Sequence, residues 1–136
     1  MAGTFKFELV SPERILMSVD AEQAVIPGSE GEFTVLPGHA PVIAELLPGV
    51  IHVTLPAGKK AIYVKAGFVE VNPESATVLA GHAFVVDEAD PRQLDNELAA
   101  AEDALKNAKD DEALRHISRA IEQLKVLQSG GGRRTA

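Results

Sequence analysis

The segment that decides the fold runs from Gly28 to Gly49 and reads GSEGEFTVLPGHAPVIAELLPG. Two short apolar runs, residues 33–36 and 42–47, are separated by Pro-Gly and His-Ala-Pro. Because a residue before proline is pushed toward extended geometry and glycine allows a positive φ, this segment cannot form a helix. It predicts two short strands joined by a proline-fixed elbow, with an acidic hairpin turn in front of them.

The rest of the N-terminal part repeats this pattern of short apolar runs between turn residues. Phe5, Phe7 and Leu9 alternate with polar residues, which is typical of a half-buried strand. Further strands are expected at residues 15–19, 22–26, 50–55, 61–65, 68–71 and 77–79. The lone Gly67 and Gly81 suit bulges or tight corners. We therefore predict an all-β sandwich or barrel of about ten short strands over residues 1–86.

The chain changes character near residue 87. No glycine lies between His82 and Ser129, and Pro91 is the last proline. Asp90 is placed to cap a helix that begins at Pro91, and Gln93 completes a capping box. This boundary is therefore one of secondary structure, from strands punctuated by glycine and proline to uninterrupted helix.

Two apolar stripes with helical spacing follow. The first contains Leu94, Leu98, Ala101, Leu105 and Ala108, and the second contains Ala113, Leu114, Ile117, Ala120, Ile121, Leu124 and Leu127. Between them, Asp110 or Asp111 can cap the second helix. The short connection predicts a C-terminal antiparallel αα-hairpin over residues 87–128, and the tail at 129–136 is expected to be disordered. Because such helices are marginal alone, the hairpin must dock on the sandwich or on a neighbouring subunit.

Composition excludes several classes of function. The net charge is -7, which argues against nucleic acid as a partner. The chain has no cysteine, so it has neither disulfides nor thiolate metal sites. Its first residues do not resemble a signal peptide. The longest nearly uncharged run, residues 33–58, is interrupted by prolines, so no direct membrane insertion is expected.

The sequence shows no catalytic constellation. Its histidines have no metal-binding spacing, which also argues against a sandwich enzyme of the cupin type, and nucleophile-elbow and phosphate-loop motifs are absent. Glu30 and Glu32 lie in an exposed turn, where solvation denies them the raised pKa of a general acid. We expect no catalytic residue, no metal and no cofactor. His39 is either a loop histidine bonded to backbone or a residue that contacts a partner.

Two blocks of sequence carry a resemblance to a known family. The first is the segment quoted above, and the second is YVKAGFVEVNPESATVLA, residues 63–80. In this order and separation they resemble the epsilon subunit of bacterial F-type ATP synthase, and the similarity covers nearly the whole chain. The resemblance implies a non-catalytic subunit of the rotor, held on the cytoplasmic face of the bacterial inner membrane by other subunits. It would link the gamma subunit, the central shaft, to the membrane c-ring.

The resemblance also implies which residues meet those partners. The acidic turn and the elbow would face the c-ring and gamma through Ser29, Glu30, Glu32, His39 and Pro41. Carboxylates on a rigid turn suit bidentate pairing with arginine on a partner. The alternative is that these acids only keep the turn soluble.

For the helices, the resemblance implies contact with the catalytic alpha and beta subunits and regulation of ATP hydrolysis. The residues concerned are Leu94, Asp95, Arg115 and Arg119.

Some relatives bind ATP through motifs resembling LDxxRA and RAxxRL, which here read LDNELA and RAIEQL, so Leu98 and Gln123 replace arginines. Losing two charged hydrogen bonds disfavours tight binding. The alternative function is an ATP-sensing regulator, and calorimetric titration with ATP separates the two.

Overall fold

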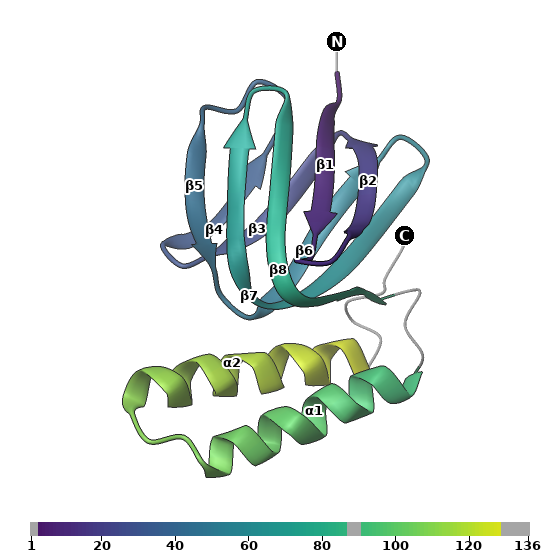
Figure 1. Ribbon diagram of the computed structural model, residues 1–136. Coiled ribbons are helices and arrows are strands. Elements are labelled where there is room, and N and C mark those ends of the chain that lie inside the picture. The colour runs from purple at the N-terminus through teal and green to yellow at the C-terminus, as the bar shows by residue number, and fades with distance from the viewer. Residues whose placement is uncertain (1–2, 87–90, 129–136) are drawn as a thin grey trace.

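The computed structural model describes residues 3–86 and 91–128 and shows a β-sandwich with two helices side by side against one end (Figure 1). The strands are β1 (Phe5–Val10), β2 (Ile15–Ala21), β3 (Gln23–Gly28), β4 (Gly31–Val35), β5 (Val42–Leu46), β6 (Gly49–Leu55), β7 (Gly58–Asn72) and β8 (Ser75–Val85). The helices are α1 (Pro91–Lys106) and α2 (Asp111–Gln128). The predicted cap at Asp90 and the predicted disordered tail at 129–136 lie outside the described residues.

The predicted sandwich followed by a helix hairpin is confirmed, with fewer and longer strands than expected. The described ranges contain eight strands rather than about ten. The predicted strands 61–65 and 68–71 are one continuous strand, β7, and the predicted strand 77–79 extends to Val85 in β8. Strand order is β2-β1-β8-β7-β5-β3-β4, and β6 pairs with β3 and β7. One pairing, β1 with β8, is parallel.

The main core lies inside the sandwich and follows the alternation of the strands. Phe7 and Leu9 of β1 are fully buried, as the alternating pattern predicted. They pack with the inward residues of the other strands, among them Ile26, Val35, Ile51, Val53, Ile62, Val64, Val69 and Val78. All members of this core cluster come from the strands. The sandwich therefore carries a hydrophobic core of its own.

In both β7 and β8, the side of the strand that faces the main core changes part-way along the strand. In β7, Ile62 and Val64 join the main core near one end, whereas Val69 and Val71 do so near the other. The inward residues of β7 therefore change from even-numbered to odd-numbered, and this change occurs where the register shifts between Val64 and Gly67. Gly67 has a positive φ of 154°, and a Cβ there would collide with the Leu79 carbonyl oxygen. The bulge expected at this lone glycine is therefore confirmed.

The helix hairpin is antiparallel, as predicted (Figure 1). Asp110 caps α2, because its Oδ1 accepts a hydrogen bond of 2.7 Å from the Ala113 amide. Among the hairpin residues that the structure describes, those buried are Leu94, Ala101, Ala120, Leu124 and Leu127. Leu114 of the predicted apolar stripe is 38% exposed, whereas Ile121, on nearly the same side of α2, is partly buried.

Candidate functional site

The acidic turn is the tip of the β3–β4 hairpin. Gly28 pairs with Gly31 across the turn, which leaves Ser29 and Glu30 exposed at its apex. The Ser29 amide donates a hydrogen bond of 2.8 Å to the Glu45 carbonyl oxygen of β5, so the tip is tied to a second strand. Glu32, the next acid along β4, is also exposed. The tip therefore presents acidic side chains from a backbone held on both sides.

The elbow between β4 and β5 lies at the other end of these two strands. Its turn is held to the β7–β8 turn by a hydrogen bond of 2.8 Å from the Gly38 amide to the Pro73 carbonyl oxygen. His39 Nδ1 lies 2.7 Å from the Ala40 carbonyl oxygen, which is the backbone contact expected for a loop histidine. The His39 ring also lies 6.1 Å from the Phe33 ring, centroid to centroid. Pro41 is exposed beside it.

A groove joins the tip to the elbow. β4 and β5 do not pair with each other, and a cavity of about 440 Å³ lies against both. Its lining residues are Gly28, Ser29, Glu30, Gly31, Phe33, His39, Val42, Ile43, Ala44 and Glu45. Among the predicted contact residues, Ser29, Glu30 and His39 therefore share this groove, whereas Glu32 and Pro41 are not part of its lining. Carboxylates with an aromatic wall suit a cationic, planar side chain.

A row of exposed or half-buried apolar side chains crosses the sheet beside this groove. We call it the outer row, and it consists of Ile15, Val10, Leu79, Phe68 and Ile43. Ile15 lies directly opposite Val10, Val10 opposite Leu79, and Leu79 opposite Phe68, each pair on neighbouring strands. Ile15, Phe68 and Leu79 are 59%, 53% and 49% exposed. Ile43, 73% exposed, lies diagonally across from Phe68 and also lines the groove.

Sequence reasoning missed the outer row, although the sequence contains its signal. Adjacent apolar residues occur at Leu9-Val10, Phe68-Val69 and Val78-Leu79. In a strand, neighbouring side chains point to opposite faces, so one residue of each pair must leave the core. Leu9, Val69 and Val78 are the buried members. Repetition of such pairs in strands that pair together predicts an apolar surface on the outer face.

The hairpin covers the other half of the same outer face. Beyond the bulge, Ala61 and Tyr63 of β7 and Phe84 of β8 turn away from the main core. They form a second buried cluster, which we call the docking cluster, with Val86 and with Leu94, Ala101, Leu124 and Leu127 of the helices. Arg119 Nε donates a hydrogen bond of 2.9 Å to the Pro48 carbonyl oxygen, which ties α2 to the β5–β6 turn. The hairpin is therefore docked on the sandwich.

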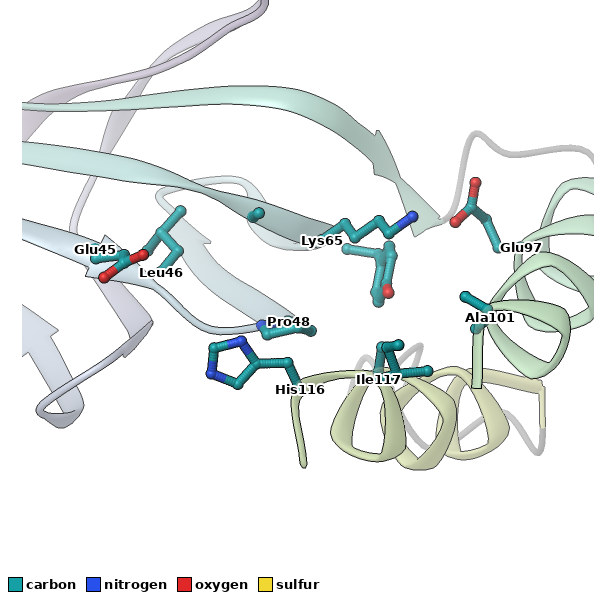
Figure 2. Close-up of a pocket in the computed structure, with 12 residues that line it drawn as sticks. Glu45, Leu46, Pro48, Lys65, Glu97, Ala101, His116 and Ile117 are labelled. Carbon is teal, nitrogen blue, oxygen red and sulfur yellow. The ribbon is translucent and has the colours of Figure 1, made fainter. Parts of the chain in front are cut away.

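The docked hairpin leaves a cavity of about 210 Å³ at this junction. Figure 2 shows Glu97 and Ala101 reaching it from α1, and His116 and Ile117 from α2. Lys65 projects along the side of the cavity that belongs to β7 (Figure 2). The cavity therefore combines an apolar floor with charged side chains at its margin.

The predicted regulatory residues have different surroundings. Leu94 is buried in the docking cluster, and Asp95 Oδ1 accepts a hydrogen bond of 2.7 Å from Gln128 at the end of α2. Arg119 bonds the sandwich, whereas Arg115 is exposed. Leu98, at a position where ATP-binding relatives are expected to carry arginine, packs partly buried against the docking cluster. Three of the four predicted residues thus stabilise the hairpin or its docking in this structure.

The pKa of the Tyr63 phenol is linked to this docking. Burial, together with the charge of Glu97 on α1, raises the pKa of the Tyr63 phenol to about 12. The neutral phenol is favoured in the docked state, so its contribution to docking is complete below pH 10 and is lost as the pH rises toward 12.

We predict that a chain ending at Val86 has a Tyr63 pKa close to 10, because the hairpin and Glu97 are then missing. The chain has one tyrosine and no tryptophan, so the ultraviolet absorbance of tyrosinate measures this group alone. The intact chain is the control, with a pKa of about 12. A truncated, folded chain that kept this value would contradict a role of the hairpin in burying the ring.

Among the residues that the structure describes, no group of three or more histidine, aspartate or glutamate side chains could hold a metal ion. None of the helices described is long and apolar enough to cross a membrane.

Comparison with known proteins decides the family. The family model described as ATP synthase, Delta/Epsilon chain, beta-sandwich domain matches residues 4–86. The ATP synthase epsilon chain of Brucella anthropi is 43% identical over 129 residues, which is 94% of this chain and 96% of the relative. The chain belongs to the ATP synthase epsilon chain family. The epsilon chain of Brucella canis is 42% identical over the same shares of both chains.

Solved structures agree on the fold of this epsilon chain. A chain of the mitochondrial ATP synthase of Euglena gracilis matches with a TM-score of 0.69 and 22% identity, over 94% of this chain and 81% of that one. A chain in the central stalk and c-ring structure of the Tetrahymena thermophila enzyme gives a TM-score of 0.61 and 11% identity, over 91% and 96%. The match over more than nine tenths of the chain includes sandwich and hairpin together.

Proposed function

We propose that this epsilon chain is a non-catalytic central-stalk subunit of a proton-translocating F-type ATP synthase, joining the gamma shaft to the membrane c-ring. The observation that carries the proposal is the continuity of the outer row with the tip-and-elbow groove through Ile43. One apolar and one acidic surface adjoin on a rigid sandwich. Such an arrangement suits a protein that binds two different partners at once.

The outer row is the proposed contact with the gamma subunit. Monomeric proteins seldom expose a contiguous band of large apolar side chains, and such bands mark interaction sites. The row crosses β2, β1, β8, β7 and β5, so its shape is held by the hydrogen bonds of the sheet. A rigid apolar face can transmit torque without first paying the entropy of ordering its own backbone.

The groove and tip are the proposed contact with the polar loops of the c-ring. Glu30 and Glu45 line the groove together with Phe33 and His39, whose rings lie 6.1 Å apart, centroid to centroid. An arginine from a ring loop can pair with the carboxylates and stack on an aromatic ring at the same time. The partner surface would therefore be basic, in keeping with the net charge of -7.

The hairpin is the proposed regulatory part. We assign residues 1–86 to a rotor-binding sandwich and 87–128 to a hairpin that modulates ATP hydrolysis by changing between its sandwich site and the alpha and beta subunits. The separate main core and docking cluster support this division. The protein would be peripheral, on the cytoplasmic face of the bacterial inner membrane, held there by its partner subunits.

Charge reversal at the tip tests the c-ring contact. The double variant Glu30→Lys, Glu32→Lys should weaken attachment to the ring and reduce coupling of proton flow to ATP synthesis in reconstituted enzyme. Exposed ion pairs are screened, so the defect should depend on salt concentration. A several-fold loss is expected, since exposed pairs each contribute about 0.2–1 kcal/mol.

The matched control is the double variant Glu102→Lys, Asp103→Lys, which makes the same change of charge on the exposed side of α1. Its coupling to the ring should stay at the wild-type level. Unchanged coupling in the tip variant, at low and high salt, would count against a contact at this turn.

A further inference from the structure

We infer that the ion pair between His82 on β8 and Glu97 on α1 makes docking of the hairpin depend on pH in the neutral range. The inference concerns the chain by itself and does not rest on the proposed partners. His82 Nε2 contacts Glu97 Oε2 directly. The side chain of Glu97 is only 16% exposed, whereas that of His82 is 52% exposed. One partner is thus held in the junction and the other remains accessible to protons.

The position of the pair links the two parts of the molecule. His82 follows the register shift in β8 and lies opposite Ala66 of β7. Glu97 lies three residues after Leu94 and four before Ala101, so it shares a helix face with two buried members of the docking cluster. Separating hairpin and sandwich breaks this pair. Formation of the pair therefore requires the docked state.

The chemistry sets the direction of the effect. Histidine ordinarily gains its charge between pH 8 and pH 5. A neutral imidazole offers Glu97 one hydrogen bond, whereas an imidazolium adds an opposite charge and makes the bond charge-assisted. The charged form of the ring therefore holds Glu97, and with it the hairpin, more strongly than the neutral form does. By linkage, docking must strengthen as the pH falls through this range.

The other ionisable side chains that line the junction cavity are of types that ordinarily keep one charge state in this range, with one exception. Glu45 of β5 and Lys65 of β7 line the same cavity (Figure 2), and carboxylates and lysines ordinarily keep their charges between pH 6 and pH 8. Tyr63 has its pKa raised to about 12 and stays neutral. Arg119, which bonds Pro48, is always charged. His116 of α2 is the exception and needs its own variant.

The test measures docking directly in the full chain. Because the sequence has no cysteine, Lys59→Cys on the sandwich and Glu112→Cys on the hairpin provide two unique sites for a fluorescent donor and acceptor. The urea concentration is chosen so that the hairpin is docked in half of the molecules at pH 7. Between pH 8 and pH 6, the ratio of docked to undocked chain should rise about two- to fivefold, as expected for one partly exposed pair.

Four variants in this labelled chain identify the group responsible. His82→Gln and Glu97→Gln should each abolish the pH response, whereas His116→Gln should retain it. His39→Gln is the matched control, because His39 lies in the elbow and contacts Phe33 and Ala40. A docking ratio independent of pH in the wild type, or an unchanged response in both His82→Gln and Glu97→Gln, would overturn the inference. Loss of the response in His116→Gln alone would overturn it too.

Discussion

Replacement of Phe68 and Leu79 by aspartate should greatly weaken binding of this chain to the gamma subunit while the sandwich stays folded. Both side chains are about half exposed, at 53% and 49%, and they face each other across β7 and β8 in the centre of the outer row. Aspartate at either place is solvated in the free chain. In an apolar interface the same carboxylates would be buried without partners, which costs several kcal/mol each.

The expected loss of affinity for purified gamma, measured by titration calorimetry, is at least about a hundredfold, since each 1.4 kcal/mol is a factor of ten. Thr34→Asp combined with His52→Asp is the control, because both residues are exposed on strands but lie outside the outer row. Circular dichroism verifies folding of both variants. An affinity within a few-fold of wild type would show that gamma binds elsewhere.

Replacement of Gly67 by alanine should produce the largest loss of stability among single changes in the sandwich. The backbone at Gly67 has a φ of 154°, which side chains rarely allow, and the new methyl group would meet the Leu79 carbonyl oxygen. Relief of this contact requires β7 and β8 to separate at the bulge, where both strands exchange their faces. We expect the free energy of unfolding to fall by about 3 kcal/mol or more.

Urea denaturation followed by circular dichroism measures this loss. Gly81→Ala is a close control, since Gly81 lies beside the register shift of the opposite strand, has no positive φ, and leaves open space for a Cβ. Its effect should stay below about 1 kcal/mol. Equal stability of Gly67→Ala and Gly81→Ala would mean that the bulge accepts a side chain, and the assignment of the face exchange to Gly67 would be wrong.

By itself, the sequence determined the local structure of this protein. Pro-Gly and Gly-rich turns placed the hairpin tip and the elbow, and alternation placed Phe7 and Leu9 in the core. The uninterrupted apolar stripes after Pro91 predicted the two helices, and Asp110 was one of the two residues predicted to cap the second helix. These features were predictable because each depends on the conformational limits of a few neighbouring residues.

Only the tertiary structure decided which residues share a surface. The joining of two predicted strands into β7 depends on pairing with both β5 and β6, which are separate in the chain. The outer row gathers residues from five strands, and the pair of His82 with Glu97 exists only when α1 lies against β8. Such contacts depend on strand register and on the packing of distant segments. Local periodicity specifies which side chains leave the core, but long-range pairing determines what they meet.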